Sequence, residues 1–315
     1  MLKTLMATAA TAALLALPAT AFELDERYSD ADGDLIADIP ADESQWLDPS
    51  VLIFAYTPVE DPAVYAEVWQ PFLDHMSALT GKDVQFFPVQ SNAAQIEAMR
   101  AGRLHVAGFN TGSNPLAVAC AGFRPFAMMA AEDGSFGYEM EIITYPGSGI
   151  ATVEDIKGRQ LAFTSETSNS GFKAPSAILA SEFDMIPERD FTPAFSGAHD
   201  QSILGVVNKD YDAASIANSV RKRMVSRDVI SEDSYEIVYT SQTFPTTGYG
   251  TVYNLHPDLQ EKVREAFFTF DWTGTSMETE FQNSGEAQFI PITFQKNWAV
   301  IRQIDEANGV SYSCN

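Results

Sequence analysis

FTSETSNSGFKAPS, at residues 163–176, is a small polar segment between two apolar ones. The apolar run before it, residues 160–163, is typical of a β-strand, and the run after it, residues 176–183, is typical of a helix. The first N–H groups of a helix have no partner within the helix, and the helix dipole favours negative charge there. Hydroxyl groups beside those N–H groups would complete a binding site for an anion. An ordinary serine N-cap has the same local sequence, so the rest of the chain has to separate the two interpretations.

Length and charge limit the classes of protein to consider. The chain has 315 residues, of which 45% are hydrophobic, and this is enough for one large or two ordinary domains with a full core. The net charge is -24 and the pI is about 4.3. Such a surface repels nucleic acid and anionic lipid, so we exclude both as partners. It also repels small anions at long range, so an anion site here must depend on local dipoles and hydrogen bonds.

The N-terminus has the pattern of a secretory signal peptide. Lys3 precedes an apolar run from Leu5 to Leu17, and Ala19-Thr20-Ala21 has the A-x-A form of a cleavage site. The apolar run is well short of the roughly 20 residues that a membrane span needs. We therefore expect residues 1–21 to be removed before Phe22, leaving a soluble protein in the periplasm. A lipid anchor is not expected, because no cysteine follows the cleavage site.

Two cysteines are present, Cys120 and Cys314. In an exported protein two cysteines are expected to form a disulfide, which here would tie the C-terminal tail to the first half of the fold. Two free buried thiols are the alternative.

Residues 22–50 form an acidic, turn-rich segment that precedes the first strand. Four aspartates follow one another at short intervals: Asp30, Asp32, Asp34 and Asp38. Alternate aspartates can offer carboxylates to Ca²⁺, but Gly33 is not at the sixth loop position and the bidentate glutamate of an EF-hand is missing. A solvated acidic segment is the favoured interpretation, with a calcium-binding loop as the alternative.

Strands and helices then alternate over the first 120 residues. The expected strands are residues 51–55, 84–89 and 104–109, and the expected helices are residues 63–79 and 93–101 and a third that ends at Ala119. The first helix has an apolar stripe, formed by Val64, Val68, Phe72 and Met76. Such repeats predict a parallel sheet, and ligands bind at the carboxyl ends of its strands. Asn110, Thr111 and Ser113 follow the third strand and are candidates for this site.

Two long extended segments, residues 138–145 and 236–241, are interpreted as strands that cross between two α/β units. Residues 51–140 and 245–315 would then form lobe 1, and residues 141–244 would form lobe 2. The chain has no common nucleotide-binding, hydrolase or zinc-binding motif. The predicted fold is therefore α/β, with two lobes that close like a clam.

Several motifs resemble those of the phosphate/phosphite/phosphonate-binding proteins of ABC importers. Residues 168–175 resemble the family's Ser-Thr-Ser-Gly-x-x-x-Pro loop, and residues 197–200 resemble its Gly-x-His-[Asp/Glu] junction. Residues 155–158 and 241–245 resemble two further segments, and the likeness runs in order from about Leu52 to about Ile304. The resemblance implies a type II periplasmic binding protein, with a mixed, mainly parallel sheet flanked by helices in each lobe. It also implies a small oxyanion as ligand, a membrane permease as partner, a monomer and no cofactor.

Carried over by position, the resemblance also implies which residues bind the ligand. The serine-rich loop supplies Ser168, Asn169, Ser170 and Gly171, with Asn169 in place of a threonine. His199 is the junction histidine, expected to be charged and to donate to an oxygen, so no lysine or arginine is needed. Further candidates are aromatic and hydroxyl residues, namely Tyr56, Tyr138, Thr246, Thr247 and Tyr249. Many members have an acidic residue where Thr247 stands, and its loss argues against an aminoalkyl phosphonate as ligand.

Two other functions stay open. One is an exported hydrolase of phosphorus esters with a Ser–His pair, which would need a third group to orient the base. Asp200 adjoins His199 in sequence, but neighbouring residues on a helix point apart. The other is a ligand sensor that docks on a membrane receptor, which the sequence does not separate from an importer subunit.

Overall fold

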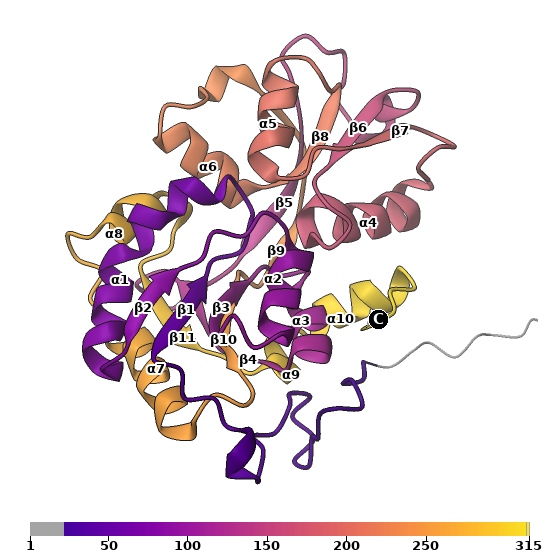
Figure 1. Cartoon of the computed structure of the whole chain (residues 1–315). Helices are drawn as coiled ribbons and strands as arrows, with labels where there is room; N and C mark the ends of the chain where they lie inside the picture. The colour runs from indigo at the N-terminus through magenta and orange to yellow at the C-terminus, as the bar shows by residue number, and fades with distance from the viewer. Residues whose placement is uncertain (1–21, 313, 315) are drawn as a thin grey trace, which may run out of the picture.

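The protein has two halves, each built on one β-sheet (Figure 1). The computed structural model describes residues 22–312 and residue 314, so the predicted signal peptide lies outside the described residues. The first sheet has the strand order β11-β4-β10-β3-β1-β2 and the second has the order β7-β6-β8-β5-β9. We call the half with the first sheet lobe 1 and the other lobe 2. The predicted two-lobed α/β fold is confirmed.

Lobe 1 is formed by the first part and the last part of the chain. Its strands are β1 (Val51–Ala55), β2 (Asp83–Phe86), β3 (Val106–Phe109), β4 (Phe123–Ala130), β10 (Gly248–Val252) and β11 (Gln288–Pro291). Its helices are α1 (Tyr65–Thr80), α2 (Asn92–Arg100), α3 (Asn114–Ala121), α7 (Pro257–Thr269), α8 (Ser276–Phe281), α9 (Phe294–Asn297) and α10 (Ala299–Ala307). β4 and α8 were not predicted.

Lobe 2 is formed by the middle of the chain. Its strands are β5 (Tyr138–Thr144), β6 (Gln160–Phe163), β7 (Thr192–Phe195), β8 (Ala213–Ala217) and β9 (Glu236–Phe244). Its helices are α4 (Ala174–Phe183), α5 (His199–Val207) and α6 (Asn218–Ser226), and a short π-helix (Asn169–Lys173) runs directly into α4.

Both sheets are mixed, because the strands that connect the lobes run against the βαβ repeats. β1 is parallel to β2 and β3, and β6 is parallel to β7 and β8. The remaining pairs, which involve β4, β5, β9, β10 and β11, are antiparallel, so the sheets are less parallel than predicted. β5 and β9 pair with each other, and Tyr138 faces Phe244 at the end where both strands meet lobe 1. This end of the β5–β9 pair is where the chain crosses between the lobes.

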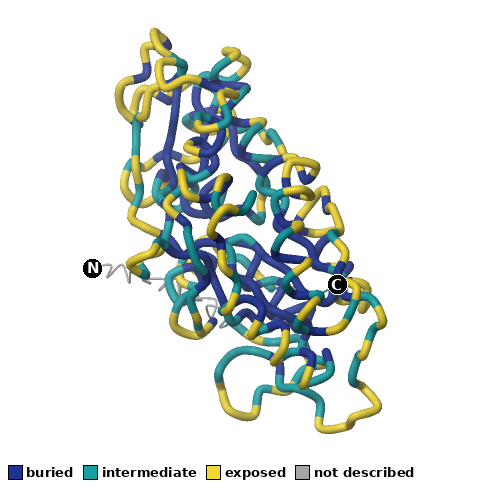
Figure 2. Tube along the Cα trace, turned by 90° about the vertical axis from the view of Figure 1, so that its left-hand side faces the viewer, coloured by how far each residue is buried: buried dark blue, intermediate teal, exposed yellow. Residues whose placement is uncertain are grey.

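Buried segments run through the centre of each lobe (Figure 2). In lobe 1, α1 contributes Tyr65, Trp69, Phe72 and Met76 to the core, whereas Val64 is exposed and Val68 half-buried. Val68 packs against the core from a half-buried position, so the predicted stripe is wrong only at Val64. Cys120, in α3, and Cys314, after α10, form the predicted disulfide. Among the described residues, no helix has both the length and the apolar character to cross a membrane.

Candidate functional site

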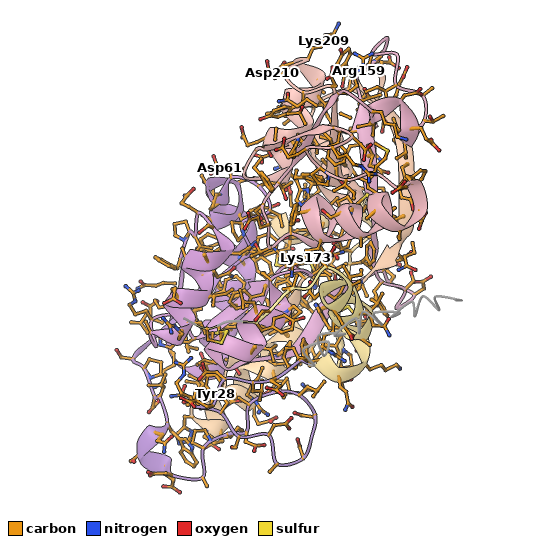
Figure 3. All side chains as sticks on the ribbon, turned by 90° about the vertical axis from the view of Figure 1, so that its right-hand side faces the viewer. Tyr28, Asp61, Arg159, Lys173, Lys209 and Asp210 are labelled. Carbon is orange, nitrogen blue, oxygen red and sulfur yellow. A yellow bond between two sulfur atoms is a disulfide. The ribbon has the colours of Figure 1, made fainter. Side chains whose placement is uncertain are left out.

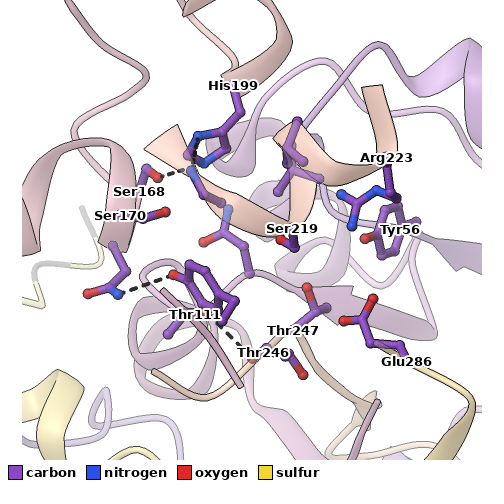
Figure 4. Close-up of a pocket in the computed structure, with 16 residues that line it drawn as sticks. Tyr56, Thr111, Ser168, Ser170, His199, Ser219, Arg223, Thr246, Thr247 and Glu286 are labelled. Carbon is purple, nitrogen blue, oxygen red and sulfur yellow. Dashed lines mark hydrogen bonds between the residues drawn. The ribbon is translucent and has the colours of Figure 1, made fainter. Parts of the chain in front are cut away.

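A cavity of about 50 Å³ lies between the lobes and is lined by sixteen residues (Figure 4). Lobe 1 contributes the segments after β1 and β3 and the segment before β10, and lobe 2 contributes those after β6, β7 and β8. These are mostly carboxyl ends of parallel strands, where open α/β sheets bind ligands. Since one water needs about 10–15 Å³, the cavity has room for about three to five waters, which is the size of a tetrahedral oxyanion.

Ten of the thirteen predicted residues line this cavity: Tyr56, Asn110, Thr111, Tyr138, Ser168, Asn169, Ser170, His199, Thr246 and Thr247. The other three, Ser113, Gly171 and Tyr249, are not in its lining. Tyr249 is fully buried in the aromatic core of lobe 1, and Ser113 N–H donates to Asn110 Oδ1 at 2.9 Å. Both therefore support residues of the site from behind.

The serine-rich loop begins the helical segment that continues into α4. Ser168 is its N-cap, and Ser168 Oγ accepts a hydrogen bond from Gly171 N at 3.0 Å. Asn169 and Ser170 hold the first two helical positions, whose N–H groups have no acceptor within a helix. A Cβ at Gly171 would come within 1.9 Å of Thr164 Oγ1, so only glycine allows the loop to pack this closely. Ser168 thus both caps the helix and lines the cavity.

His199 enters the cavity from the start of α5 and is almost completely buried. Its Nδ1 accepts a hydrogen bond from Ala217 N at 3.2 Å, so the proton of the neutral ring is on Nε2, which lies 3.4 Å from Ser168 Oγ. Burial lowers the pKa of His199 to about 4. In this structure the imidazole is therefore neutral at pH 7, and the expectation of a charged ring is wrong. It still presents an N–H donor.

The lobe 1 wall is fixed by hydrogen bonds among its own residues. Asn110 Nδ2 donates to Asn92 Oδ1 at 2.9 Å, and Thr111 Oγ1 donates to Pro245 O at 2.7 Å. Trp298 Nε1 donates to Thr111 O at 2.9 Å. In the lobe 2 wall, Asn169 Nδ2 donates to Tyr138 OH at 3.2 Å. These bonds hold polar groups of the wall in fixed directions.

Sequence reasoning missed six lining residues: Val59, Ala217, Ser219, Val220, Arg223 and Glu286. Ser219, Val220 and Arg223 are on α6, which was not predicted. A local signal for Arg223 exists, since residues 221–223 are a basic run soon after β8 in a strongly acidic chain. Glu286 has no comparable signal, because it lies in a turn before β11 and comes from a distant part of the sequence.

Arg223 belongs to a buried ion-pair network that joins the lobes. Its Nη2 lies 3.1 Å from Glu60 Oε2 and its Nε lies 3.5 Å from Glu280 Oε1, and Arg227 also pairs with both glutamates. Burial alone would raise the pKa of Glu60, but the two guanidinium groups outweigh it and hold that pKa below its usual range. The cavity wall therefore includes the guanidinium group of Arg223, whose positive charge is already paired with Glu60 and Glu280.

A second buried ion pair lies behind the serine-rich loop. Lys173 ends the π-helix in lobe 2, and its Nζ lies 2.9 Å from Asp305 Oδ1 of α10 and donates to Gly112 O at 2.8 Å. Figure 3 shows Lys173 where lobe 2 meets α10. Asn308 Nδ2 donates to Lys173 O at 2.9 Å, and Tyr312 OH donates to Asp305 Oδ2 at 2.8 Å. The C-terminal helix thus holds the loop from the opposite lobe.

The acidic segment before β1 is far from these groups in sequence and forms its own loop. Asp30, Asp32 and Asp34 bring carboxylate oxygens within 4.8 Å of one another, and Asp38 is not part of this group. Asp30 already accepts hydrogen bonds from Gly33 N at 2.9 Å and Asp34 N at 3.0 Å. Calcium binding there stays a prediction.

Comparison with known proteins identifies relatives over most of the chain. Residues 54–298 match the family described as ABC transporter, phosphonate, periplasmic substrate-binding protein. The phosphate-import protein PhnD of Mycolicibacterium smegmatis is 26% identical over 284 residues, which cover 85% of this chain and 86% of that protein.

Solved structures show the same fold. A binding protein component of an ABC phosphonate transporter from Pseudomonas aeruginosa has a TM-score of 0.73 and 23% identity, with 82% of this chain and 86% of that chain covered. PhnD1 from Prochlorococcus marinus, in complex with methylphosphonate, has a TM-score of 0.73 and 16% identity, with 84% and 100% covered. The protein therefore belongs to the periplasmic substrate-binding proteins of the phosphonate family of ABC transporters.

Proposed function

We propose that the protein binds a small phosphorus oxyanion, namely a phosphonate, phosphite or phosphate, in the cavity between its lobes and delivers it to a membrane permease. The observation that carries this proposal is the convergence of Ser168, Ser170 and His199 on one cavity of the size of a tetrahedral anion. The relatives named above, one a phosphate-import protein and one solved with methylphosphonate, support the same class of ligand.

The chemistry of the lobe 2 wall suits an anion. Ala217 N–H fixes the tautomer of His199, so Nε2 donates. Ser168 Oγ accepts a hydrogen bond from Gly171 N, so its own proton is free to point into the cavity. An oxyanion that leaves water must recover its hydrogen bonds, and these groups with the first two helical N–H groups can replace them. Neutral, directed donors also avoid conflict with the acidic surface.

Hinge closure is the motion that we propose for binding. His199 N donates to Val59 O at 3.1 Å, and the Glu60–Arg223 and Lys173–Asp305 pairs also join the lobes around the cavity. These contacts can form only when the lobes are close together. The β5–β9 pair, which connects the lobes, is the natural place for the hinge.

Binding without catalysis fits the pair of Ser168 and His199 better than ester hydrolysis does. A serine nucleophile needs a base that can take its proton, with a third group that orients the base. Here Nδ1 of His199 accepts from a backbone N–H, so Nε2 already carries the proton and cannot take another without becoming charged in a buried site. The carboxylate of Asp200 accepts from Gln201 N at 2.9 Å instead. We therefore propose that the protein is not an enzyme. From the family alone, we propose that it acts as a monomer.

Titration calorimetry with phosphate, phosphite and methylphosphonate tests this proposal. We expect micromolar or tighter binding of at least one of them by the wild type. Ser170→Ala should weaken that binding about tenfold to a hundredfold, because it removes a hydrogen bond to a charged group. Ser165→Ala, in the same loop but outside the cavity lining, is the matched control and should bind normally. Absence of heat and of a thermal shift with all three anions would contradict the proposal.

A further inference from the structure

Gly112 brings the backbones of the two lobes into direct contact at the edge of the cavity. It is buried in the turn of lobe 1 between β3 and α3. A Cβ at this position would lie 2.3 Å from Thr167 O, 2.4 Å from Asn169 N and 2.9 Å from Ser168 C, and all three atoms belong to the serine-rich loop of lobe 2. Thr111, Ser168 and Asn169 line the cavity, so this contact forms part of its boundary.

The contact between the lobes gives a reason for glycine at this position. The φ angle of Gly112 is not in the left-handed region, so its own backbone conformation would accept alanine. The three atoms that would overlap a methyl group all belong to the other lobe. Gly250 differs in this respect, because it lies in β10 and its nearest neighbour is Arg124 O in β4 of the same lobe.

Both sides of the contact are held by hydrogen bonds within their own lobe. In lobe 1, Asn114 N donates to Asn110 O at 2.9 Å and closes the turn that contains Gly112. In lobe 2, Ser168 N donates to Ser165 O at 3.0 Å. The overlapping atoms belong to the backbone, so no change of rotamer would make room. A side chain at Gly112 would therefore keep the two lobes apart.

Two hydrogen bonds also cross between the lobes at this contact. Asn92 Nδ2, in lobe 1, donates to Thr167 Oγ1 at 2.8 Å, and Lys173 Nζ, in lobe 2, donates to Gly112 O at 2.8 Å. Asn92 Oδ1 in turn accepts from Asn110 Nδ2, and Asn110 lines the cavity. The contact and the cavity wall therefore share one geometry, which exists only when the lobes are this close.

We propose that Gly112 is a positioning residue that sets how closely the lobes approach each other, and thereby limits tight binding to the smallest phosphorus oxyanions. This inference rests on the proposed function and names the size of the ligand within it. The cavity has a volume of about 50 Å³ when the contact is formed. A methyl group requires about 3.4 Å to its neighbours in place of 2.3 Å, so it would move the two walls apart by about 1 Å at this edge.

A displacement of that size matters for a small ligand. Hydrogen bonds have donor–acceptor distances of about 2.7–3.2 Å and weaken beyond them. A small oxyanion can reach donors of both lobes only while the walls keep the observed distance. Propylphosphonate carries a longer chain, for which the closed cavity has no room. It would keep the lobes apart in the wild type as well, so a side chain at Gly112 should affect its binding less.

The test compares the wild type with Gly112→Ala. Titration calorimetry gives the dissociation constants for methylphosphonate and propylphosphonate. Stopped-flow tryptophan fluorescence gives the rates, since Trp298 donates to Thr111 O behind the cavity wall. Thermal unfolding without ligand reports on the fold. Gly250→Ala is the matched control, because the same substitution there overlaps backbone within lobe 1 and outside the cavity lining.

We expect Gly112→Ala to bind methylphosphonate about tenfold more weakly or worse, because hydrogen bonds to a charged ligand are lost on one wall. The loss should lie in faster dissociation, with an association rate close to that of the wild type, since closure follows the first encounter. The preference for methylphosphonate over propylphosphonate should fall. Binding of methylphosphonate within twofold of the wild type, or an unchanged preference between the two phosphonates, would overturn the inference.

Thermal unfolding separates a role in closure from a role in the fold. Without ligand, Gly112→Ala should melt close to the wild type, because the lobes can move apart to accommodate the methyl group. Gly250→Ala should melt much lower or fail to fold, because its overlap persists in every arrangement of the lobes. A loss in Gly112→Ala as large as that in Gly250→Ala would overturn the inference. A wild type that binds none of the phosphorus oxyanions would instead remove the proposed function.

Discussion

At the scale of single residues, Ser168 serves the fold and the candidate site together. It caps the π-helix through Gly171 N and also faces the cavity beside His199. Sequence reasoning predicted this loop because strand, polar turn and helix start follow one another within residues 160–183. It did not predict Glu286, since a carboxyl group in a turn far along the chain has no local pattern that points to a cavity. Proximity of distant segments is a property of the fold and is not visible locally.

Gly171 gives a prediction about the packing of this loop. Gly171→Ala should destabilise the protein by about 1–3 kcal/mol and weaken ligand binding, because the new methyl group would overlap Thr164 Oγ1. The double variant Gly171→Ala/Thr164→Ala removes the nearest overlapping atom and should regain part of the loss. Chemical unfolding and ligand titration measure both effects. Equal stability of the single and double variants would contradict the packing argument.

His199 gives a prediction about pH. Its pKa is 6.5 as a free group and about 4 in the folded protein, because burial disfavours the charged ring. Between these values the unfolded chain binds more protons, so the stability that is fully present above pH 6.5 is lost as the pH falls towards 4. The loss from this group is about 3 kcal/mol.

The variant His199→Gln should lack this pH-dependent contribution to the free energy of unfolding. Urea unfolding of wild type and variant without ligand, at pH 7.5 and pH 4.5, isolates it, since the carboxylates titrate in both proteins. Between these two pH values the wild type should lose about 2.5 kcal/mol more than the variant. An equal loss would mean that the imidazole is not buried in its neutral form.

At the scale of helices and strands, the sequence predicted most elements. It failed where contacts between distant segments determine which of two similar apolar stripes is buried. For α1, a stripe starting at Val64 and one starting at Tyr65 differ by a single residue, or about 100° of rotation. The helix begins at Tyr65 after a 3-10 turn (Pro62–Val64), and Tyr65 and Trp69 pack with Phe281 from α8. That cluster forms between distant segments, so the local pattern could not select it.

The pair of Lys173 and Asp305 gives a prediction about how α10 holds the serine-rich loop. Both side chains are buried, so Asp305→Leu or Lys173→Met alone should cost about 3–5 kcal/mol of stability by leaving one charge unpaired. Ligand binding should weaken as well, because Lys173 ends the helix that begins at Asn169.

The combined variant Lys173→Met/Asp305→Leu removes both charges and should recover most of the stability. Unfolding free energies of the wild type, both single variants and the double variant give the coupling between the two sites. A double variant whose loss equals the sum of the single losses would contradict a direct interaction.

At the scale of the whole molecule, the disulfide joins parts of the chain that are 194 residues apart. A cross-link over so long a segment limits the unfolded chain strongly, so Cys120→Ser/Cys314→Ser should lose about 2–5 kcal/mol of stability. Thermal unfolding of the wild type with and without reductant should show the same difference, with the redox state checked by mass. Identical melting of oxidised and reduced protein would contradict this role.

The net charge of the molecule and the way charges pair inside it explain which ligand-binding groups could be inferred from the sequence. The net charge of -24 directed attention to local donors, and Arg223 was missed because α6 was not predicted. In the structure its charge is matched by Glu60 and Glu280 from lobe 1. The two-lobed architecture followed from repeated strand–loop–helix units. The contacts that close the cavity, such as His199 N to Val59 O, depend on the relative position of the lobes, which no short segment specifies.

A crystal structure of the protein with methylphosphonate tests the central claim most directly. The account predicts one tetrahedral ligand between the lobes, with phosphonate oxygens at hydrogen-bonding distance from Ser168 Oγ, Ser170 Oγ and His199 Nε2. A phosphonate bound at another place, with the cavity between Ser170 and His199 left to water, would contradict it.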